Sequence, residues 1–468
     1  MENSQKYRWW FIVLFVLSLT LRLGLAVVNR EANDNHMEVV RMIMETRRLP
    51  IMFECRECFH PKLFYGTAAA LLQSFGIADP TAQIVFVQLL IVAAGMMTLA
   101  IIYKFIKAYP SENELLKLAA FALVALNPKL IAINSQASND TFAILFSTLA
   151  LYFTYIYLKD SGQKHFWLLV FFILLAVSTK VTSWIAFAAI FLSFLLTLWV
   201  QAEKINRKLT YLSLLLVLVL ALTTLNPFSQ FVTNTQKFGF PIVTRDQRLP
   251  FPDLVKQTAH YKNYHFRPGI VSIQDGFFTF KLVELLKYPL TTNGQYGYPP
   301  QRTSFWTMLY ADSHSLHFQN WPPSWQTQGE ENFTVTRVIF LLALPPTLIF
   351  ISGFLLELFI FLKALFARDK PKIHALGSAL FLLATGGYLA FLMLASLLYR
   401  DFAFIKLAYI LPGLLAFTWV FLRGAERLVS HFRWGQYLLI GWTTALSAFY
   451  IWDVLNLTLQ LASANLHF

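Results

Sequence analysis

Apolar runs about 20 residues long, which is the length a helix needs to cross the hydrocarbon layer of a bilayer, dominate the sequence. Only 13% of the 468 residues are charged and the mean hydropathy is +0.53, whereas soluble domains carry about 25% charged residues. The alternating pattern of a membrane β-barrel is absent, so the runs predict helices, whose backbone groups are satisfied internally. We therefore expect an all-α integral membrane protein with about eleven transmembrane helices. The runs are 9–28, 82–103, 116–134, 140–158, 165–180, 182–200, 209–227, 336–362, 375–398, 403–422 and 436–455.

The distribution of Lys and Arg predicts the topology. If the N-terminus is cytoplasmic, every short loop on that side is basic and the short loops on the other side carry little positive charge. The net charge of +13 then reflects topology, and we expect no nucleic-acid partner. Residues 9–28 are too long for a signal-peptide core and lack a clear cleavage site, so we interpret them as the first span.

Two long segments interrupt the runs on the predicted extracytoplasmic side. Residues 29–81 contain apolar positions at helical spacing near 37–44 and again at 63–78, which predicts two helices lying in the membrane interface. Residues 228–335 are rich in Pro, Tyr, Phe and Gln, which predicts a small extracytoplasmic cap. The resulting division is a transmembrane module with the first loop (1–227), the cap (228–335) and C-terminal transmembrane helices (336–468).

A short acidic patch directly follows the first run, and it contains Asp34. Sugar transfer to a hydroxyl needs a base that accepts the proton of the acceptor, and one carboxylate suffices when the leaving group is already a stable phosphate. Asp34 lies among small polar residues, where water and substrate have access. Glu38, four residues on, would share its helix face. The alternative is that Asn33 or Asp34 only caps a helix that opens at about residue 35.

The segment 55–65 combines the two cysteines of the chain with a basic motif. His60 is a candidate for orienting a phosphate or an acceptor, and Lys62 adds positive charge. For Cys55 and Cys58 three states remain open: a disulfide, which an extracytoplasmic location allows, a zinc site completed by His60 with or without His36, or two free thiols. One C-x-x-C with a nearby His is a weak metal signal, so a divalent metal stays an option only.

Two helix junctions on the same side carry charged residues. Asp140 either caps the helix that follows it or helps to position Asp34. Lys180 lies between two apolar runs, where a lysine snorkels to lipid phosphates or binds the phosphate of a lipid-linked donor.

Near the C-terminal runs, Lys406 is predicted one turn inside a span, where a cation needs a counter-charge. A lipid-linked phosphate would supply that charge, and the alternative is an ion pair of Lys406 or Arg400 with Asp401. In the large loop, aromatic residues next to Asp312 and His314 suit either a sugar-binding surface or interfacial anchoring. The sequence has no P-loop, no H-E-x-x-H and no G-x-S-x-G motif.

In their order along the chain these motifs resemble the GT-C polytopic glycosyltransferases. The closest resemblance is to the group of protein O-mannosyltransferases and lipid A aminoarabinose transferases. The matching elements are an acidic residue in the first loop, an H/Q-P-P-L-x-Y-like element in which Lys62 replaces the second Pro, an N-D and a T-K element at later junctions, and a late R…K…Y-x-x-P element. In this sequence they are Asp34, residues 60–65 ending in Tyr65, Asn139-Asp140, Thr179-Lys180, and Arg400, Lys406, Tyr409 and Pro412.

The resemblance implies an inverting transfer of a hexosyl or pentosyl group from a polyprenyl-phosphate donor to a hydroxyl of a protein, lipid or glycan acceptor. Asp34 would be the general base. Donor phosphate would be bound by Lys406, Arg400 and Lys180, and acceptor or sugar would be positioned by Glu38, His60, Asp140 and Tyr65. The expected location is a bacterial plasma membrane, in contact with membrane lipids and with the active site extracytoplasmic.

The competing interpretation is a polytopic transporter or flippase for lipids or sugars. Such proteins often show inverted repeats and charged, broken helices at the middle of the membrane. The sequence shows no such halves, and its notable charges cluster at one face, which favours the transferase.

Overall fold

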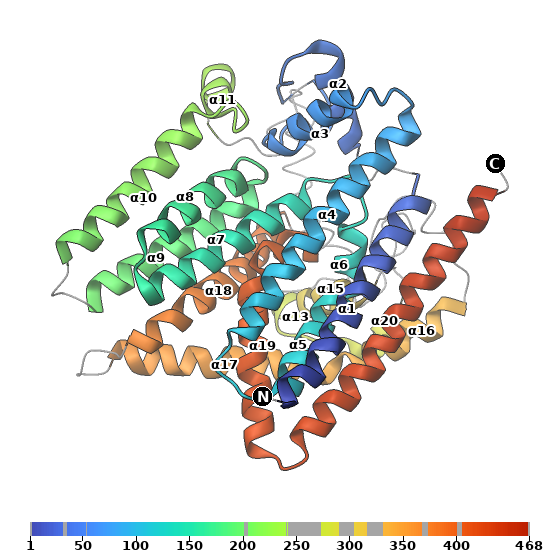
Figure 1. Ribbon diagram of the computed structural model, residues 1–468, viewed down its shortest axis with the longest axis vertical. Helices are drawn as coiled ribbons and strands as arrows, with labels where there is room; N and C mark the ends of the chain where they lie inside the picture. Colours follow the sequence, from blue (N-terminus) through green and yellow to red (C-terminus); the bar gives the residue numbers. More distant parts are fainter. Residues whose placement is uncertain are drawn as a thin grey trace.

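The computed structural model describes residues 2–30, 35–52, 54–200, 205–239, 241, 273–289, 304–315, 331–366, 373–399 and 405–466, and this part of the chain contains helices and no strand. Figure 1 shows the helices as one bundle. Their bounds are α1 (Glu2–Val28), α2 (His36–Thr46), α3 (Leu63–Ser74), α4 (Pro80–Lys107), α5 (Glu114–Ala125), α6 (Pro128–Ile133), α7 (Asp140–Asp160), α8 (Gln163–Val177), η1 (Val181–Ser183), α9 (Trp184–Val200), α10 (Ile205–Leu225), α11 (Phe231–Phe238), α13 (Ile273–Phe277), α14 (Leu282–Lys287), α15 (Phe305–His314), α16 (Glu331–Leu342), α17 (Leu344–Phe366), α18 (Ile373–Tyr399), η7 (Leu407–Tyr409), η8 (Leu411–Gly413), α19 (Leu414–His431) and α20 (Gly435–Leu466).

The predicted class, an all-α membrane protein, is confirmed. Within the described ranges, seven helical segments are long and apolar enough to cross a membrane, and two shorter apolar helices accompany them. The long segments are Tyr7–Val28, Pro80–Lys107, Asp140–Asp160, Val181–Leu198, Thr334–Phe366, Ser378–Ser396 and Gly435–Asn465, and the shorter ones are Gln163–Val177 and Thr210–Leu225. All nine coincide with predicted runs.

The other two predicted runs, 116–134 and 403–422, are interrupted. The first divides into α5 and α6, because Pro128 begins a new helix and the side chain of Asn127 accepts the Leu130 N–H at 2.9 Å. In the second run, the described chain from residue 405 passes through the 3₁₀ turns η7 and η8 before α19 begins at Leu414. These breaks place irregular backbone inside the bundle, a feature that membrane proteins show where backbone is buried in protein or lines a cavity.

The end of α5 is held by a buried arginine of α1. Arg22 is fully buried and donates to the carbonyl of Ala125 at 3.0 Å, and the hydroxyl of Ser18 donates to the same oxygen at 2.7 Å. A cation at the C-terminus of a helix is favoured by the helix dipole, and the two donors satisfy a carbonyl that the break leaves without its helical partner.

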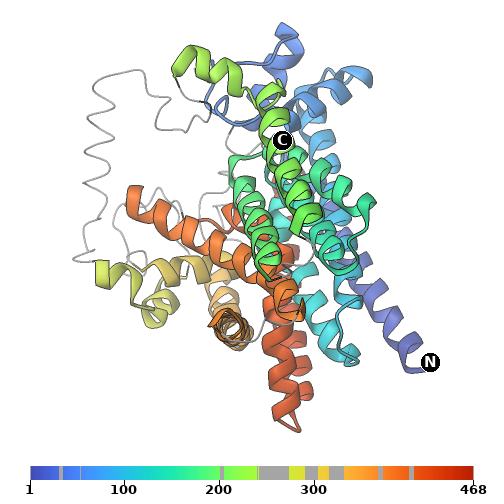
Figure 2. The same cartoon turned by 90° about the vertical axis from the view of Figure 1, so that its left-hand side faces the viewer.

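The two helices predicted in the first loop are present as α2 and α3. Their apolar faces are buried, including Met37 and Val40 of α2, and the two helices pack against each other. Figures 1 and 2 both show them at the same end of the bundle as α11. The loop is joined to the end of α10 because the Lys62 N–H donates to the carbonyl of Phe228 at 2.7 Å.

The described parts of 228–335 include α15, which is buried in the main hydrophobic core and packs against α6 and η7. Phe305, Tyr310 and Asp312 of this helix are buried, whereas Trp306 is 38% exposed, so a sugar-binding surface and interfacial anchoring both stay predictions for Trp306 alone. The division of the chain into three units stays a prediction.

Two glycines bring α17 and α19 into close contact. A Cβ on Gly353 would lie 2.0 Å from the carbonyl oxygen of Val420, and one on Gly424 would lie 2.0 Å from the oxygen of Ile349. Small residues allow membrane helices to approach this closely.

We therefore expect Gly353→Ala and Gly424→Ala each to destabilise the protein by about 1–3 kcal/mol through overpacking. Gly386→Ala in α18 is the matched control, because its Cβ meets nothing within 4 Å. Thermal unfolding in detergent, followed by circular dichroism, measures the difference. Equal midpoints for all three variants would contradict the contact.

Candidate active site

A buried ion pair between Lys180 and Asp140 forms the centre of the candidate site. Asp140 is the first residue of α7, and Lys180 lies just after α8, so the pair joins two helix ends. Lys180 is only 5% exposed. The hydroxyl of Ser138 also donates to Asp140, at 3.2 Å. Lys180 therefore points into the protein instead of snorkelling to lipid. Asp140 is not the cap of α7, because Asn139 occupies the N-cap position and Asp140 pairs with Lys180.

An aromatic residue connects Lys180 to the segment that carries Lys406. The Lys180 ammonium lies 5.1 Å from the ring centroid of Tyr409, a cation–π contact. Tyr409 belongs to η7, which begins directly after Lys406. Two of the three predicted phosphate-binding residues are therefore on adjoining segments. The third, Arg400, lies outside the described residues, as does its proposed partner Asp401.

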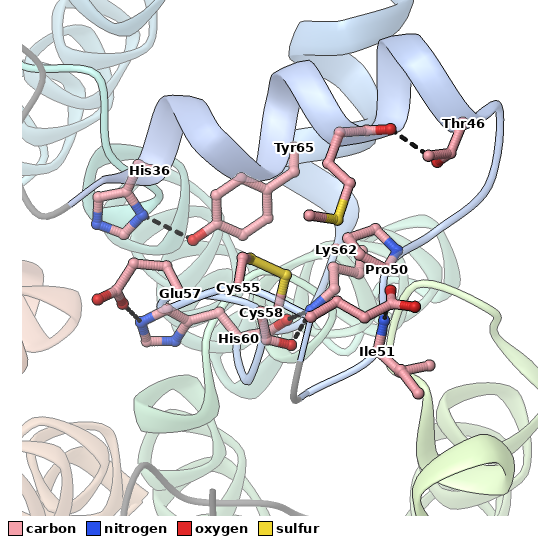
Figure 3. The surroundings of a disulfide bond; sticks show 12 residues. His36, Thr46, Pro50, Ile51, Cys55, Glu57, Cys58, His60, Lys62 and Tyr65 are labelled. Atoms are coloured by element: carbon pink, nitrogen blue, oxygen red, sulfur yellow. Dashed lines mark hydrogen bonds and ion pairs between the residues drawn. A yellow bond between two sulfur atoms is a disulfide. The ribbon is translucent and has the colours of Figure 1, made fainter.

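Four residues of the first loop, His36, Glu57, His60 and Tyr65, lie close together (Figure 3). The Tyr65 hydroxyl and Nδ1 of His36 share a hydrogen bond of 2.7 Å, and the rings of His36 and His60 stack with centroids 5.9 Å apart. Nε2 of His60 lies 3.3 Å from Oε2 of Glu57. Both histidines interact electrostatically with Asp140, so these groups and the ion pair form one cluster.

His60 is neutral at physiological pH. Burial lowers its pKa to about 4, against the opposing effect of Glu57, and the charges of Lys180 and His36 lower the pKa further. With Nε2 directed at Glu57, a neutral ring carries its proton there and keeps Nδ1 as a hydrogen-bond acceptor. His60 is thus suited to accept a hydrogen bond from a hydroxyl.

Cys55 and Cys58 form a disulfide, which decides between the three states left open by the sequence. Lys62 stabilises this loop from inside, since its ammonium donates to the carbonyls of Cys58 and His60, each at 2.5 Å (Figure 3). Burial lowers the pKa of Lys62 to about 7. The sequence predicted that Lys62 adds positive charge, but its ammonium is bound to these two loop carbonyls. Among the described residues, no group of three or more His, Cys, Asp and Glu could hold a metal.

The loop is attached next to Lys180. The Leu63 N–H donates to the carbonyl of Ser178 at 3.2 Å, and the side chain of Asn226 donates to the Ser178 hydroxyl at 2.8 Å. The disulfide loop, the end of α10 and the Lys180 junction are therefore fixed to one another.

The predictions for the residues of the acidic patch compare differently with the structure. Asn35 occupies the N-cap position of α2 in a left-handed conformation, so the helix starts one residue later than predicted. Glu38 is exposed on the face of α2 away from the histidines and lines a surface cavity of about 340 Å³ with Arg41 and Glu45. Its role in positioning an acceptor stays a prediction. Asp34 lies outside the described residues.

Sequence reasoning missed a second buried ion pair, between Lys129 of α6 and Asp312 of α15. The signal was available for Lys129, because a lysine directly after Asn127-Pro128 in an apolar run needs a counter-charge. Its partner is 183 residues away, and no local pattern identifies it. Glu57 was also not predicted as the partner of His60. It lies between Cys55 and Cys58, and the C-x-x-C pattern was interpreted only through its cysteines.

Residues 68–226, about a third of the chain, match the model of a family described as dolichyl-phosphate-mannose-protein mannosyltransferase. The matched region contains both Asp140 and Lys180. The chain therefore resembles the GT-C polytopic glycosyltransferases in this match as well as in its motifs. No curated protein matches the chain in sequence.

Solved structures that match the chain include the archaeal oligosaccharyltransferase AglB from Archaeoglobus fulgidus, with 13% identity, a TM-score of 0.47, and 98% of this chain and 56% of that chain covered. Another is ArnT from Cupriavidus metallidurans, with 14% identity, a TM-score of 0.38, and coverage of 89% and 76%. The chain thus spans little more than half the length of the AglB chain.

The pKa of His60 predicts a pH-dependent stability. As the pH falls from about 6.5 to about 4, histidine in the unfolded chain takes up a proton while His60 in the folded protein does not, so the folded state loses stability across that range. We expect His60→Gln to show a smaller loss between these two pH values than the wild type.

The measurement is the thermal unfolding midpoint in detergent at several pH values. His431→Gln, which replaces an exposed histidine at the end of α19, is the matched control. The assignment would be wrong if His60→Gln and His431→Gln retained the full pH dependence of the wild type.

Proposed function

We propose that the protein is a membrane glycosyltransferase that moves a sugar from a polyprenyl-phosphate donor to an acceptor hydroxyl. The observation that carries the proposal is the buried Lys180, held by Asp140 and packed on Tyr409, with Lys406 on the adjoining turn. A preorganised cation of this kind stabilises the charge that develops on a departing phosphate. The family model supports the same reaction class, because its description names a dolichyl-phosphate sugar and its match includes Asp140 and Lys180.

The leaving phosphate determines which groups the reaction needs. A polyprenyl phosphate leaves as a stable anion, so no general acid is required, and the acceptor hydroxyl needs a single base. Asp34 is the proposed base, and only one residue separates it from His36 in the sequence. Direct attack by the acceptor on the anomeric carbon forms the new glycosidic bond as the bond to phosphate breaks, which inverts the configuration.

The groups around the ion pair have supporting roles in this proposal. Lys180, Lys406 and Arg400 bind the donor phosphate. His60, through the acceptor lone pair of its Nδ1, and Tyr65, through its contact with His36, position the acceptor or the sugar together with Asp140 and Glu38. The site faces the extracytoplasmic side if the N-terminus is cytoplasmic, as the distribution of Lys and Arg indicates.

The experiment is transfer of label from a panel of radiolabelled polyprenyl-phosphate sugars by membranes that contain the wild type, Asp34→Asn or Glu112→Gln. We expect transfer by the wild type with at least one donor and a loss of about 10²–10⁴-fold in Asp34→Asn, which is the usual contribution of a general base. Glu112→Gln removes an exposed carboxylate from the α4–α5 loop and should retain wild-type transfer.

Two results would overturn parts of the proposal. Full transfer by folded Asp34→Asn would exclude this residue as the base while leaving the reaction class intact. Absence of transfer and of donor binding for every member of the panel, with folded protein, would favour the transporter or flippase.

A further inference from the structure

The buried carboxylate of Asp312 connects α15 to the turn that carries two residues of the candidate site. Asp312 is 0% exposed and forms an ion pair with Lys129, which is 2% exposed. Its Oδ2 also accepts the backbone N–H of Leu407 at 2.5 Å. Leu407 is the first residue of η7, so this bond fixes the backbone directly after Lys406.

The position of this bond matters because the chain around it is irregular. Residues 405–413 form two short 3₁₀ turns instead of a long helix, and such turns have few internal hydrogen bonds to define their position. Tyr409, two residues after Leu407, contacts Lys180, while Asp312 accepts the backbone N–H of Leu407. The charge of Lys406 also acts on the Asp312 carboxylate.

We propose that Asp312 is a positioning residue that holds Lys406 and Tyr409 in place for the donor phosphate through its hydrogen bond to Leu407. This inference rests on the proposed function. It assigns to α15, a helix of the segment between the two groups of transmembrane helices, a direct effect on how the donor phosphate is bound.

The role of Lys129 in this arrangement is to neutralise a carboxylate that would otherwise be costly to bury. Removing Asp312 alone would leave Lys129 without this partner and would destabilise the fold for reasons unrelated to the turn. The test therefore changes both residues together. The attachment of α15 to α6 keeps a second bond in such variants, because the side chain of Asn127 donates to the carbonyl of Ser313 at 2.9 Å.

Two double variants differ only in the acceptor for Leu407. Asp312→Asn/Lys129→Met removes both charges but keeps an oxygen that can accept the Leu407 N–H. Asp312→Leu/Lys129→Met has the same charge and nearly the same side-chain shape, but it has no acceptor. A buried ion pair replaced by neutral residues of similar volume is often tolerated, so both variants are expected to fold.

The first measurement is the affinity of each purified variant for undecaprenyl phosphate in detergent. We expect the Asn/Met variant to bind close to the wild-type affinity and the Leu/Met variant to bind about tenfold more weakly, the effect of losing one buried hydrogen bond. Glu357→Gln, which removes the charge of a buried carboxylate that joins α17 to Arg423 of α19, is the control for a general loss of stability. It should lower the unfolding midpoint and leave the affinity unchanged.

The second measurement does not depend on the proposed function. A cysteine placed at Lys406 reports the exposure of the turn through its rate of labelling by a maleimide, because Cys55 and Cys58 are occupied in a disulfide. We expect the rate to rise several-fold when Asp312→Leu/Lys129→Met is added, and to stay unchanged when Asp312→Asn/Lys129→Met is added.

The outcomes distinguish the positioning role of Asp312 from the proposed donor site. Equal labelling rates and equal affinities in the two double variants would overturn the positioning role, since a purely structural ion pair affects both alike. A difference in labelling together with no binding of undecaprenyl phosphate by the wild type would support the positioning of the turn and contradict the proposed donor site.

Discussion

An ion pair buried at the end of an apolar bundle must be satisfied within the protein, and the arrangement around Lys180 and Asp140 follows from that constraint. The pair fixes the end of α8 against the start of α7. Tyr409 covers the ammonium, and the histidines of the first loop lie close enough to act on the carboxylate. A charge at this depth is expensive unless it is paired or used, and here it is paired, while the proposed donor phosphate would also use it.

Interrupted helices make this placement possible. A continuous apolar helix presents only side chains to its neighbours, whereas a break presents backbone donors and acceptors as well. The break before Pro128 is held by Arg22 and carries Lys129, and the turns at 405–413 carry Tyr409. Both breaks meet at Asp312, which pairs with Lys129 and accepts the Leu407 N–H.

The sequence predicted those features that arise from local pattern. The apolar runs, the helices α2 and α3, and the grouping of Lys180 with the Lys406 turn all follow from periodicity, from charge within apolar surroundings and from the order of motifs. What it could not predict depends on distant partners. His60 and Lys62 belong to one short motif, yet one faces the cluster and the other holds the disulfide loop by its carbonyls. Only the folded loop distinguishes them.

The candidate site is consequently a product of the tertiary fold. Its described residues come from the first loop, the α7 and α8 junctions and the turn before α19, and its two buried ion pairs join residues 40 and 183 positions apart. The formation of such long-range contacts carries the entropic cost of closing the loop between the two residues. Because Lys129 and Asp312 stabilise the fold only when α6, α15 and η7 are together, the geometry of the Lys406 turn depends on the packing of the bundle.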